Sequence, residues 1–283
     1  MSKFADQPYF FTPQTVNLQY PLLIYLPGMD GSGKLFTRQI PDLSKFFDIR
    51  CLVIPTNNNS GWDDLTTDVL NLIHAELEKS SFRPVYLCGE SFGGCLGLKI
   101  ACKSQNLFKR IILVNPASVF SLLPWFSLLT DACQFVPSFL FDVGALGLLP
   151  LLANLEKIEA SDRQNLLNAM RLLPPEIINH RLCMLRDFKI SEVELKKIEQ
   201  PVLLIGSESD RLSPSLSEVE RLNQILPNTQ KFILPNSGHA CLLETQVNLY
   251  QILIEHSFLT SEQPQQMLEL TSSITDFLKN SGI

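Results

Sequence analysis

Apolar and polar stretches alternate along this chain in a way that predicts strands and helices in turn. Short apolar runs stand between polar turns and are too brief to be buried helices. We expect buried strands at Tyr20 to Leu26, Ile49 to Ile54, Pro84 to Cys88, Arg110 to Asn115, Val202 to Ile205 and Lys231 to Leu234. Helical spacing of apolar residues lies between them, at about 62–79, from Phe92 onward, and near 216–226 and 243–256. Such alternation predicts an α/β fold with a mostly parallel sheet and helices on both faces.

The clearest of these helices runs from about Trp62 to Lys79. Its apolar residues recur three and four positions apart, which is the spacing of one helix face. Ser60 and Asp63 stand where a capping box has its first and last members, although aspartate replaces the usual glutamate. We therefore expect Ser60 to cap the helix.

The alternation is interrupted at about 116–190, which we interpret as an inserted cap. Its first half, Pro116 to Leu155, carries only Asp131 and Asp142 as charges. The longest uncharged apolar run there, Val143 to Ala153, is too short to span a membrane. We expect the cap to line an acyl pocket. The cap is also the part expected to contact a membrane peripherally. The alternative is a cap whose apolar surface only packs on the core.

The C-terminal segment carries a further helical pattern. Met267, Leu270, Ile274 and Phe277 share one face of a helix at about 264–280. Docking of this face on the body is the first expectation, and contact with a membrane or a partner groove is the alternative. Taken together, the pattern predicts a single domain over 1–283, with the inserted cap and this helix.

Composition narrows the class of protein. Hydrophobic residues make up 45% of the 283 positions and charged residues 18%, which indicates a globular chain. The net charge of −6 argues against nucleic acid as a partner. The first residues lack the apolar core of a signal peptide. Seven cysteines, an odd number without a C-x-x-C pair, indicate reduced thiols and a cytoplasmic location.

The strongest chemical signal is Gly89-Glu90-Ser91-Phe92-Gly93, which follows an apolar run and precedes a helical stretch. This is the G-x-S-x-G nucleophile elbow in its strand–turn–helix setting. The two glycines avoid clashes that any Cβ would create in so tight a turn. Ser91 is therefore the candidate nucleophile.

A serine hydroxyl needs a general base, and His239 is the candidate because it lies in the loop after the last expected strand. The other histidines, His74, His180 and His256, are interpreted as structural or solvated.

Asp210 follows the Val202 strand and is the candidate acid that orients the base, with Glu208 as its rival. The chain order serine, aspartate, histidine is that of α/β-hydrolases. Asp187 and Glu244 are more remote alternatives for the acid.

Two backbone N–H groups are needed to stabilise an oxyanion. Phe92 supplies one, since it follows the nucleophile directly. The other is expected from the loop Pro27 to Gly31, with Met29 preferred and Asp30 next.

The same loop begins a match to the phosphate-binding pattern G-x-x-x-x-G-K, from Gly28 to Lys34. Leu35 stands where that pattern requires a hydroxyl for Mg²⁺. We therefore expect no cofactor and no metal, and nucleotide binding is a minor alternative.

Four motifs together resemble one group of hydrolases. They are Leu26-Pro27-Gly28-Met29-Asp30-Gly31, the Ser91 pentapeptide, Val114-Asn115-Pro116-Ala117, and the segment Gly238 to Glu244. The chain resembles the hydrolase half of the plant and cyanobacterial phytyl ester synthases, members of the esterase/lipase/thioesterase group of α/β-hydrolases. No histidine has an aspartate five positions later, so the H-x-x-x-x-D motif of the acyltransferase half is missing.

The resemblance implies an α/β-hydrolase fold with a helical cap and a lipid-like acyl ester or thioester as substrate. We expect a serine-dependent hydrolase or acyltransferase that forms an acyl-enzyme. The alternative is a protein of the same fold that binds lipid without turnover.

Overall fold

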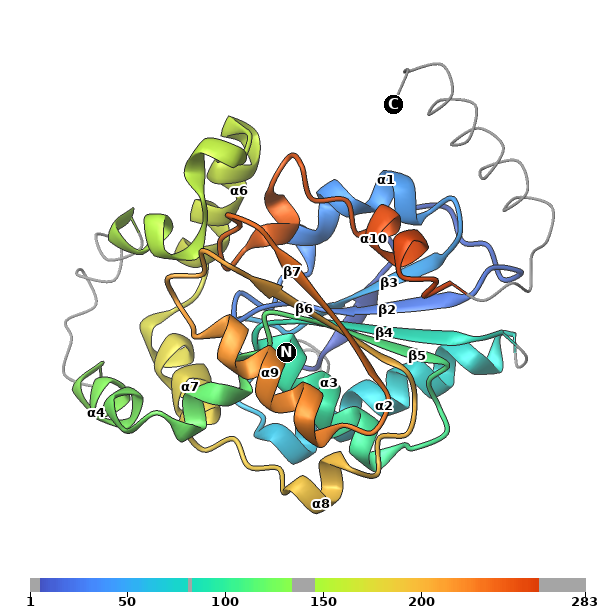
Figure 1. Cartoon of the computed structure of the whole chain (residues 1–283), viewed down its shortest axis with the longest axis horizontal. Helices are drawn as coiled ribbons and strands as arrows, with labels where there is room; N and C mark the ends of the chain where they lie inside the picture. The colour runs from blue at the N-terminus through green and yellow to red at the C-terminus, as the bar shows by residue number, and fades with distance from the viewer. Residues whose placement is uncertain (1–5, 81–82, 134–145, 260–283) are drawn as a thin grey trace. The chain divides into compact units, whose positions relative to one another are not determined.

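The computed structural model describes residues 6–80, 83–133 and 146–259. Its centre is a seven-stranded sheet in the order β1-β3-β2-β4-β5-β6-β7 (Figure 1). β1 pairs with β3 in the antiparallel sense and every other pairing is parallel. The expected α/β-hydrolase fold is therefore confirmed. The strands are β1 Tyr9–Phe11, β2 Leu22–Leu26, β3 Asp48–Val53, β4 Val85–Glu90, β5 Arg110–Val114, β6 Val202–Ser207 and β7 Thr229–Leu234.

Helices lie on both faces of the sheet, which explains why the central strands are apolar throughout. α2 (Trp62–Glu78), α3 (Phe92–Lys103) and α9 (Ser215–Ile225) cover one face, and α1 (Ile40–Leu43), preceded by the 3-10 helix η1 (Lys34–Gln39), covers the other (Figure 1). Accordingly β2, β4 and β6 are buried along their whole length, whereas β7, at the edge of the sheet, is half exposed.

The start of α2 differs from the expected capping box. The residue that caps α2 is Gly61, in an extended conformation and without a side-chain hydrogen bond to the helix. The Ser60 hydroxyl instead accepts a hydrogen bond from the Asn58 amide, 3.1 Å away. A local turn thus uses the side chain that the sequence pattern assigned to the helix.

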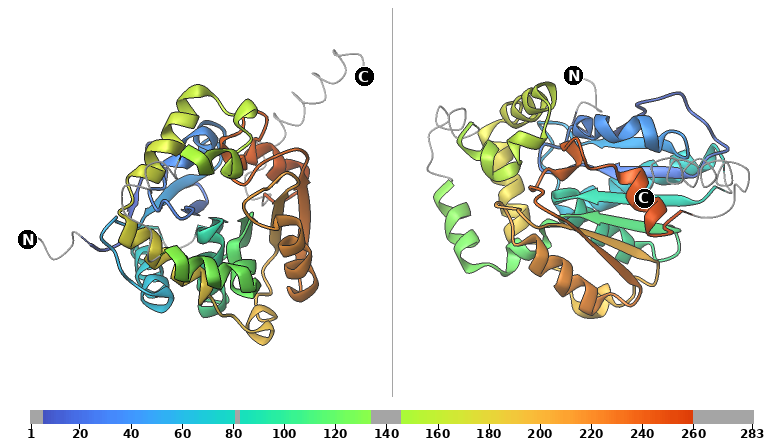
Figure 2. Two further views of the ribbon diagram at one scale, coloured as in Figure 1. Left: turned by 90° about the vertical axis from the view of Figure 1, so that its left-hand side faces the viewer. Right: turned by 45° about the horizontal axis from the view of Figure 1, so that its top comes forward.

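The inserted cap connects β5 to β6. In the described ranges it consists of η2 (Ala117–Leu122), α4 (Pro124–Cys133), a helical stretch at 146–152, η3 (Leu155–Lys157), α6 (Ala160–Arg171), α7 (Pro175–Arg186) and α8 (Glu192–Leu195). α4, α6 and α7 gather at the left-hand end of the sheet in Figure 1, the end that faces the viewer in the left panel of Figure 2. Among the helices of the described ranges, none has the length and apolar character needed to cross a membrane.

α7 is anchored to the body at two residues, His180 and Met184, one helical turn apart. The Trp62 indole donates to the Met184 carbonyl at 2.7 Å, and the His180 ring nitrogen lies 3.1 Å from the Ser60 carbonyl oxygen. Trp62 also stacks on Phe92, the first residue of α3, with ring centroids 4.6 Å apart. This part of the cap is therefore continuous with the packing around the Ser91 turn.

The helix expected from about residue 243 begins later. Cys241–Leu243 forms a 3-10 helix, η4, and α10 spans Leu249–Glu255. The buried Gln39 side chain explains the delay, because its amide donates to the carbonyls of Leu242 and Val247 and accepts from the Leu249 amide. These bonds hold the intervening backbone in a non-helical path.

The chain divides into two compact units, Met1–Leu249 and Tyr250–Ile283. The first contains the whole sheet and the cap. The second is described only as far as residue 259 and contains most of α10. The C-terminal helix expected at about 264–280 lies outside the described residues.

Candidate active site

Ser91 occupies a sharp turn between the end of β4 and the start of α3. Its backbone angles are φ 54° and ψ −113°, a conformation that costs a serine on the order of 1–3 kcal/mol. The Ser91 amide donates to the Val114 carbonyl at 2.9 Å, and its carbonyl accepts from the Gly94 amide at 2.9 Å. Bonds to both neighbouring elements therefore maintain the strained turn.

Two glycines make this turn sterically possible. A Cβ on Gly89 would lie 2.4 Å from the Gly93 carbonyl oxygen, and a Cβ on Gly93 would lie 2.1 Å from the Leu26 carbonyl oxygen. Both obstacles are backbone atoms, which cannot rotate away as a side chain can. The G-x-S-x-G spacing thus reflects how closely the start of α3 packs on the end of β2.

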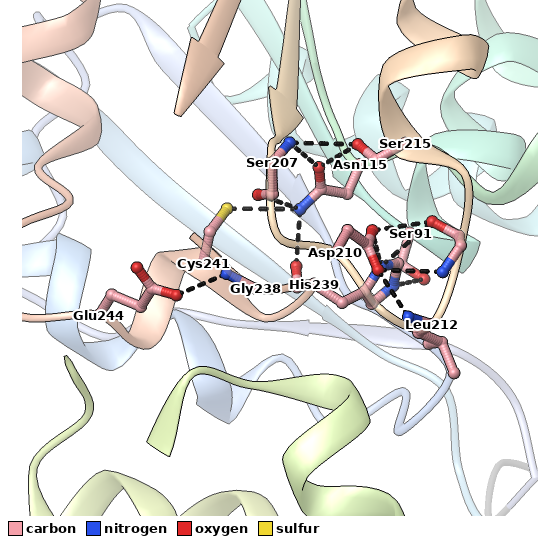
Figure 3. A network of polar contacts seen from close by, with 11 residues as sticks. Ser91, Asn115, Ser207, Asp210, Leu212, Ser215, Gly238, His239, Cys241 and Glu244 are labelled. Carbon is pink, nitrogen blue, oxygen red and sulfur yellow. Dashed lines mark hydrogen bonds and ion pairs between the residues drawn. The ribbon is translucent and has the colours of Figure 1, made fainter. Parts of the chain in front are cut away.

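The structure brings Ser91, Asp210 and His239 together at the carboxyl ends of β4, β6 and β7 (Figure 3). His239 Nε2 lies 2.8 Å from Ser91 Oγ, and His239 Nδ1 lies 2.7 Å from Asp210 Oδ2. His239 is 4% exposed, so the ring is shielded from water. This is the geometry in which an imidazole accepts the serine proton while a carboxylate fixes its tautomer.

Asp210 is held as a carboxylate. Its Oδ1 accepts from the amides of Leu212 and Ser213, each at 2.9 Å, and Oδ2 also accepts from the Ser213 hydroxyl at 2.8 Å. Burial acts to raise the pKa of Asp210, but the hydrogen bond and charge of His239, together with Ser213, lower it below the ordinary value. Asp210 is therefore an anion at neutral pH and accepts a hydrogen bond from His239 Nδ1–H.

The alternative acids have other partners. Glu208 accepts from the Asn236 amide at 2.9 Å and so closes the turn after β7. Asp187 is paired with Arg186 at 2.8 Å on the surface of the cap. Glu244 is buried and accepts from the Gly238 amide at 2.7 Å, which holds the loop that carries the histidine. Only Asp210, of the acids considered, is bonded to the His239 ring.

The turn Gly28 to Gly31 lies beside the serine. A Cβ on Gly28 would be 3.9 Å from Ser91 Cβ, and the turn is closed by a bond of 3.0 Å from the Gly31 amide to the Gly28 carbonyl. That bond leaves the Met29 N–H outside the turn's own bonding. Phe92 provides the first amide of α3, which has no partner inside the helix. Met29 and Phe92 therefore stay the predicted oxyanion donors, one in the turn beside Ser91 and the other directly after it.

Asp30, the other residue considered in that turn, has a carboxyl with several partners of its own. Burial raises the pKa of its carboxyl, while hydrogen bonds from Ser32, the charge of Arg181 and its own backbone N–H oppose the rise. The Asp30 carboxylate also accepts from the Ser32 amide at 2.9 Å, and Met29 stays the predicted second donor.

Asn115 is a site residue that the sequence reasoning did not assign. It is fully buried, and its amide group donates to the His239 carbonyl at 2.7 Å and to the Ser207 hydroxyl at 2.9 Å. Its oxygen accepts from the Ser207 amide at 2.8 Å and from the Ser215 hydroxyl at 2.6 Å (Figure 3). One side chain therefore ties the end of β5 to the loops that carry the acid and the base. The signal was present in Val114-Asn115-Pro116-Ala117, where asparagine also tolerates the positive φ of 43°.

Substituting Asn115→Asp should lower the free energy of unfolding by about 2–4 kcal/mol, because it keeps the shape but replaces two buried donors with an acceptor. Urea unfolding at pH 7 measures the change. Asn223→Asp is the matched control, since Asn223 uses only its oxygen, as acceptor for the Thr229 hydroxyl at 2.8 Å. Equal stability of the two variants would contradict the assigned role.

Glu90 is a buried carboxyl next to the serine. It accepts a short hydrogen bond from the Tyr25 hydroxyl. Burial raises the pKa of Glu90 to about 7, although the Tyr25 bond and the charge of His239 act to lower it. The second position of the pentapeptide therefore carries a group that titrates near neutral pH.

Glu90→Gln should remove a pH dependence of stability. The folded-state pKa of about 7 exceeds the ordinary glutamate value of 4.5, so between those pH values the folded protein retains a proton that the unfolded chain loses. The free energy of unfolding of the wild type should therefore fall by on the order of 3 kcal/mol, because of this group, as pH rises through that interval. The difference in unfolding free energy between variant and wild type, measured from pH 4.5 to 8, tests this; Glu78→Gln, at an exposed position of α2, is the control. Parallel curves for Glu90→Gln and wild type would refute it.

The histidines outside the site have other environments. His74 is exposed on α2, and His180 contacts the Ser60 carbonyl as described above. Within the described part of the chain, no three His, Cys, Asp or Glu side chains are arranged to hold a metal ion. The cysteines whose side chains are described are free thiols: Cys51, Cys88, Cys95, Cys102, Cys183 and Cys241.

Sequence comparison identifies related proteins. Residues 57–246 match the family model Hydrolase_4, described as serine aminopeptidase, S33. Phytyl ester synthase 1, chloroplastic, of Arabidopsis thaliana is 30% identical over 255 residues, which are 82% of this chain and 36% of that protein. Phytyl ester synthase 2, chloroplastic, of the same plant is 29% identical over 276 residues, 87% of this chain and 39% of that protein. The chain thus spans little more than a third of the length of these curated relatives.

Structure comparison agrees on the fold. An esterase (EaEST) from Exiguobacterium antarcticum superposes with a TM-score of 0.74 at 15% sequence identity, covering 90% of this chain and 99% of that one. At such identity the likeness concerns the fold alone.

Proposed function

Because the chain belongs to the Hydrolase_4 family of α/β-hydrolases and corresponds to the hydrolase module of the larger phytyl ester synthases, we propose that it is a serine-dependent acyl hydrolase. Its substrates are fatty acyl esters or thioesters. The observation that carries the proposal is the pair of contacts made by His239, 2.8 Å to Ser91 Oγ and 2.7 Å to Asp210 Oδ2.

In the first half-reaction Ser91 Oγ attacks the carbonyl carbon of the substrate, and its proton passes to His239 Nε2. The negative charge that develops on the carbonyl oxygen is stabilised by the N–H groups of Met29 and Phe92. Collapse of this intermediate breaks the bond to the alcohol or thiol, which leaves with the proton from His239. The acyl group is then an ester of Ser91.

In the second half-reaction an acceptor hydroxyl attacks the carbonyl carbon of the acyl-enzyme while His239 takes its proton. The ester bond to Ser91 then breaks, and His239 returns the proton to Ser91 Oγ. Water as acceptor gives a fatty acid, whereas an alcohol gives a new ester. The names of these relatives describe ester synthesis, so transfer to an alcohol is part of the proposal. The proportion of the two products depends on how well the acylated site excludes water.

An acyl substrate is supported by the apolar surroundings of the histidine loop. Ala240, next to His239, packs in a cluster with Leu149 and Ala153 of the cap, which also includes Leu166 of α6. An aminopeptidase, by contrast, needs carboxylates that bind the substrate's ammonium group. Asp131, one of the few charges in the first half of the cap, is paired with Arg186 at 3.0 Å.

A fluorophosphonate probe and a set of p-nitrophenyl esters test the proposal. We expect the probe to add one adduct to Ser91, located by peptide mass spectrometry, and the esters of medium and long acyl chains to be hydrolysed fastest. Adding a long-chain alcohol measures transfer, as the ratio of ester to free acid. Unlabelled protein that still extracts lipid would instead support a binding protein of the same fold, and selective cleavage of aminoacyl anilides would support a peptidase.

A further inference from the structure

Arg181 of the cap reaches the turn beside Ser91. It belongs to α7, and its side chain is 2% exposed. Nη1 donates to the Met29 carbonyl at 2.6 Å, and Nη2 donates to the carbonyls of Ile54 and Pro55 at 3.2 and 3.3 Å. The guanidinium therefore bridges the turn after β2 and the chain after β3 by donating to three backbone carbonyls.

The buried group is a cation. Burial lowers the pKa of Arg181 to about 10, and the Asp30 carboxylate opposes that effect, so the guanidinium is protonated at neutral pH. Burying a charge is unfavourable, and an aliphatic side chain would pack α7 on the body without that penalty. The cation is instead directed at the carbonyl of the residue whose N–H is the candidate oxyanion donor.

The turn is confined from both sides. Gly31 adopts φ 67°, and a Cβ there would lie 2.6 Å from Arg181 Nη1, so the guanidinium packs directly against its backbone. The Ile54 amide donates to the Gly31 carbonyl at 2.8 Å. The Gly31 amide in turn donates to the Gly28 carbonyl at 3.0 Å, and that carbonyl shares a peptide plane with the Met29 N–H. Loss of the guanidinium would therefore release both the Met29 carbonyl and the contact that holds Gly31.

We infer that Arg181 is a positioning residue for the oxyanion donor. Its guanidinium holds the peptide after Met29 through the Met29 carbonyl and packs on Gly31, whose amide bonds the Gly28 carbonyl of the peptide that carries the Met29 N–H. This inference rests on the proposed function. Oxyanion stabilisation requires donors held to within about 0.5 Å of their productive positions. The cap thus contributes to the chemistry and does not serve only to cover the site.

A simple fastening of α7 is the alternative role. The Trp62 bond to Met184 and the His180 contact with Ser60 already fasten that helix. If Arg181 only helped to anchor α7, its removal would lower stability but leave turnover per folded molecule unchanged. The two roles therefore differ in kcat, and that difference can be measured.

Arg181→Ala and Arg181→Lys are compared with wild type on a p-nitrophenyl ester, with kcat expressed per site titrated by a fluorophosphonate. We expect kcat to fall about 10- to 100-fold in both variants, with KM changed less than about threefold, because the donor acts in the transition state. Lysine keeps the charge and most of the volume, so it reports on geometry even if the alanine variant fails to fold. Arg186→Ala, on the same helix but paired with Asp187 and Asp131, is the control and should retain wild-type kcat.

Guanidinium ion at tens of millimolar should restore kcat of Arg181→Ala at least about tenfold and leave Arg186→Ala unchanged. Affinity for a trifluoromethyl ketone, which mimics the tetrahedral intermediate, should fall in parallel with kcat/KM in both Arg181 variants. Variants that titrate fully and turn over within threefold of wild type would overturn this inference alone. Wild-type protein that the fluorophosphonate does not label at all would overturn the proposed function and this inference with it.

Discussion

Replacing Ser91 with alanine is expected to lower ester turnover by about a millionfold, since only the residual catalysis of the oxyanion donors and binding would remain. The fold should persist. Ser91 Oγ makes its hydrogen bond to His239, and loss of one such bond costs about 1 kcal/mol. Turnover is measured on a p-nitrophenyl ester, and thermal unfolding reports the stability.

Ser191→Ala is the control, in which stability should fall while turnover stays unchanged. The Ser191 hydroxyl caps α8 in a reciprocal arrangement with Glu194, so its loss should cost about 1 kcal/mol of stability without any effect on turnover. Activity above about one per cent of wild type in Ser91→Ala, with contaminating esterase excluded, would show that Ser91 is not the nucleophile.

Gly93→Ala should be the most destabilising single methyl addition among the described glycines. The new Cβ would meet the carbonyl oxygens of Leu26 and Pro27 at 2.1 and 2.6 Å, and relief requires the start of α3 to move away from the end of β2. We expect a loss of at least about 3 kcal/mol of unfolding free energy, together with displacement of the Phe92 N–H. Urea unfolding and the yield of folded protein measure the effect.

Gly97→Ala, one turn further along α3, is the matched control. A Cβ there would meet three leucine side-chain atoms at 3.5 to 3.7 Å, which is ordinary contact. Alanine also restricts the unfolded chain, so the variant should be as stable as wild type or gain about 0.5–1 kcal/mol. Equal losses at both positions would contradict the packing described for the Ser91 turn.

The parallel strands could be predicted because each is a short apolar run buried on both faces. β2, β4 and β6, with no exposed residue, are the clearest examples. β1 escaped prediction since it has three residues at the edge of the sheet and depends on antiparallel pairing with β3. The start of α10 was placed too early because a distant side chain, Gln39, holds the preceding backbone. Such tertiary hydrogen bonds do not produce a periodic pattern in the sequence.

The candidate site could be predicted where chemistry depends on residue type and order. Ser91, Asp210 and His239 follow three separate strands, and a parallel sheet brings strand ends to one edge. Asn115 stands in a recognisable motif, but its role could not be assigned, and Arg181 had no such motif. The effect of each depends on which groups its side chain reaches in the fold.

The cap leaves β5 and returns to β6, neighbouring strands in which Val114 pairs with Ile205. A donor cap from another hydrolase could therefore be grafted here without altering strand order, and its length would matter little because closure entropy grows slowly with loop length. Such a chimera would nevertheless discard α7 and its guanidinium. Cap exchange should preserve turnover only when the donor supplies its own cation to the Met29 carbonyl, or when the graft ends before residue 175.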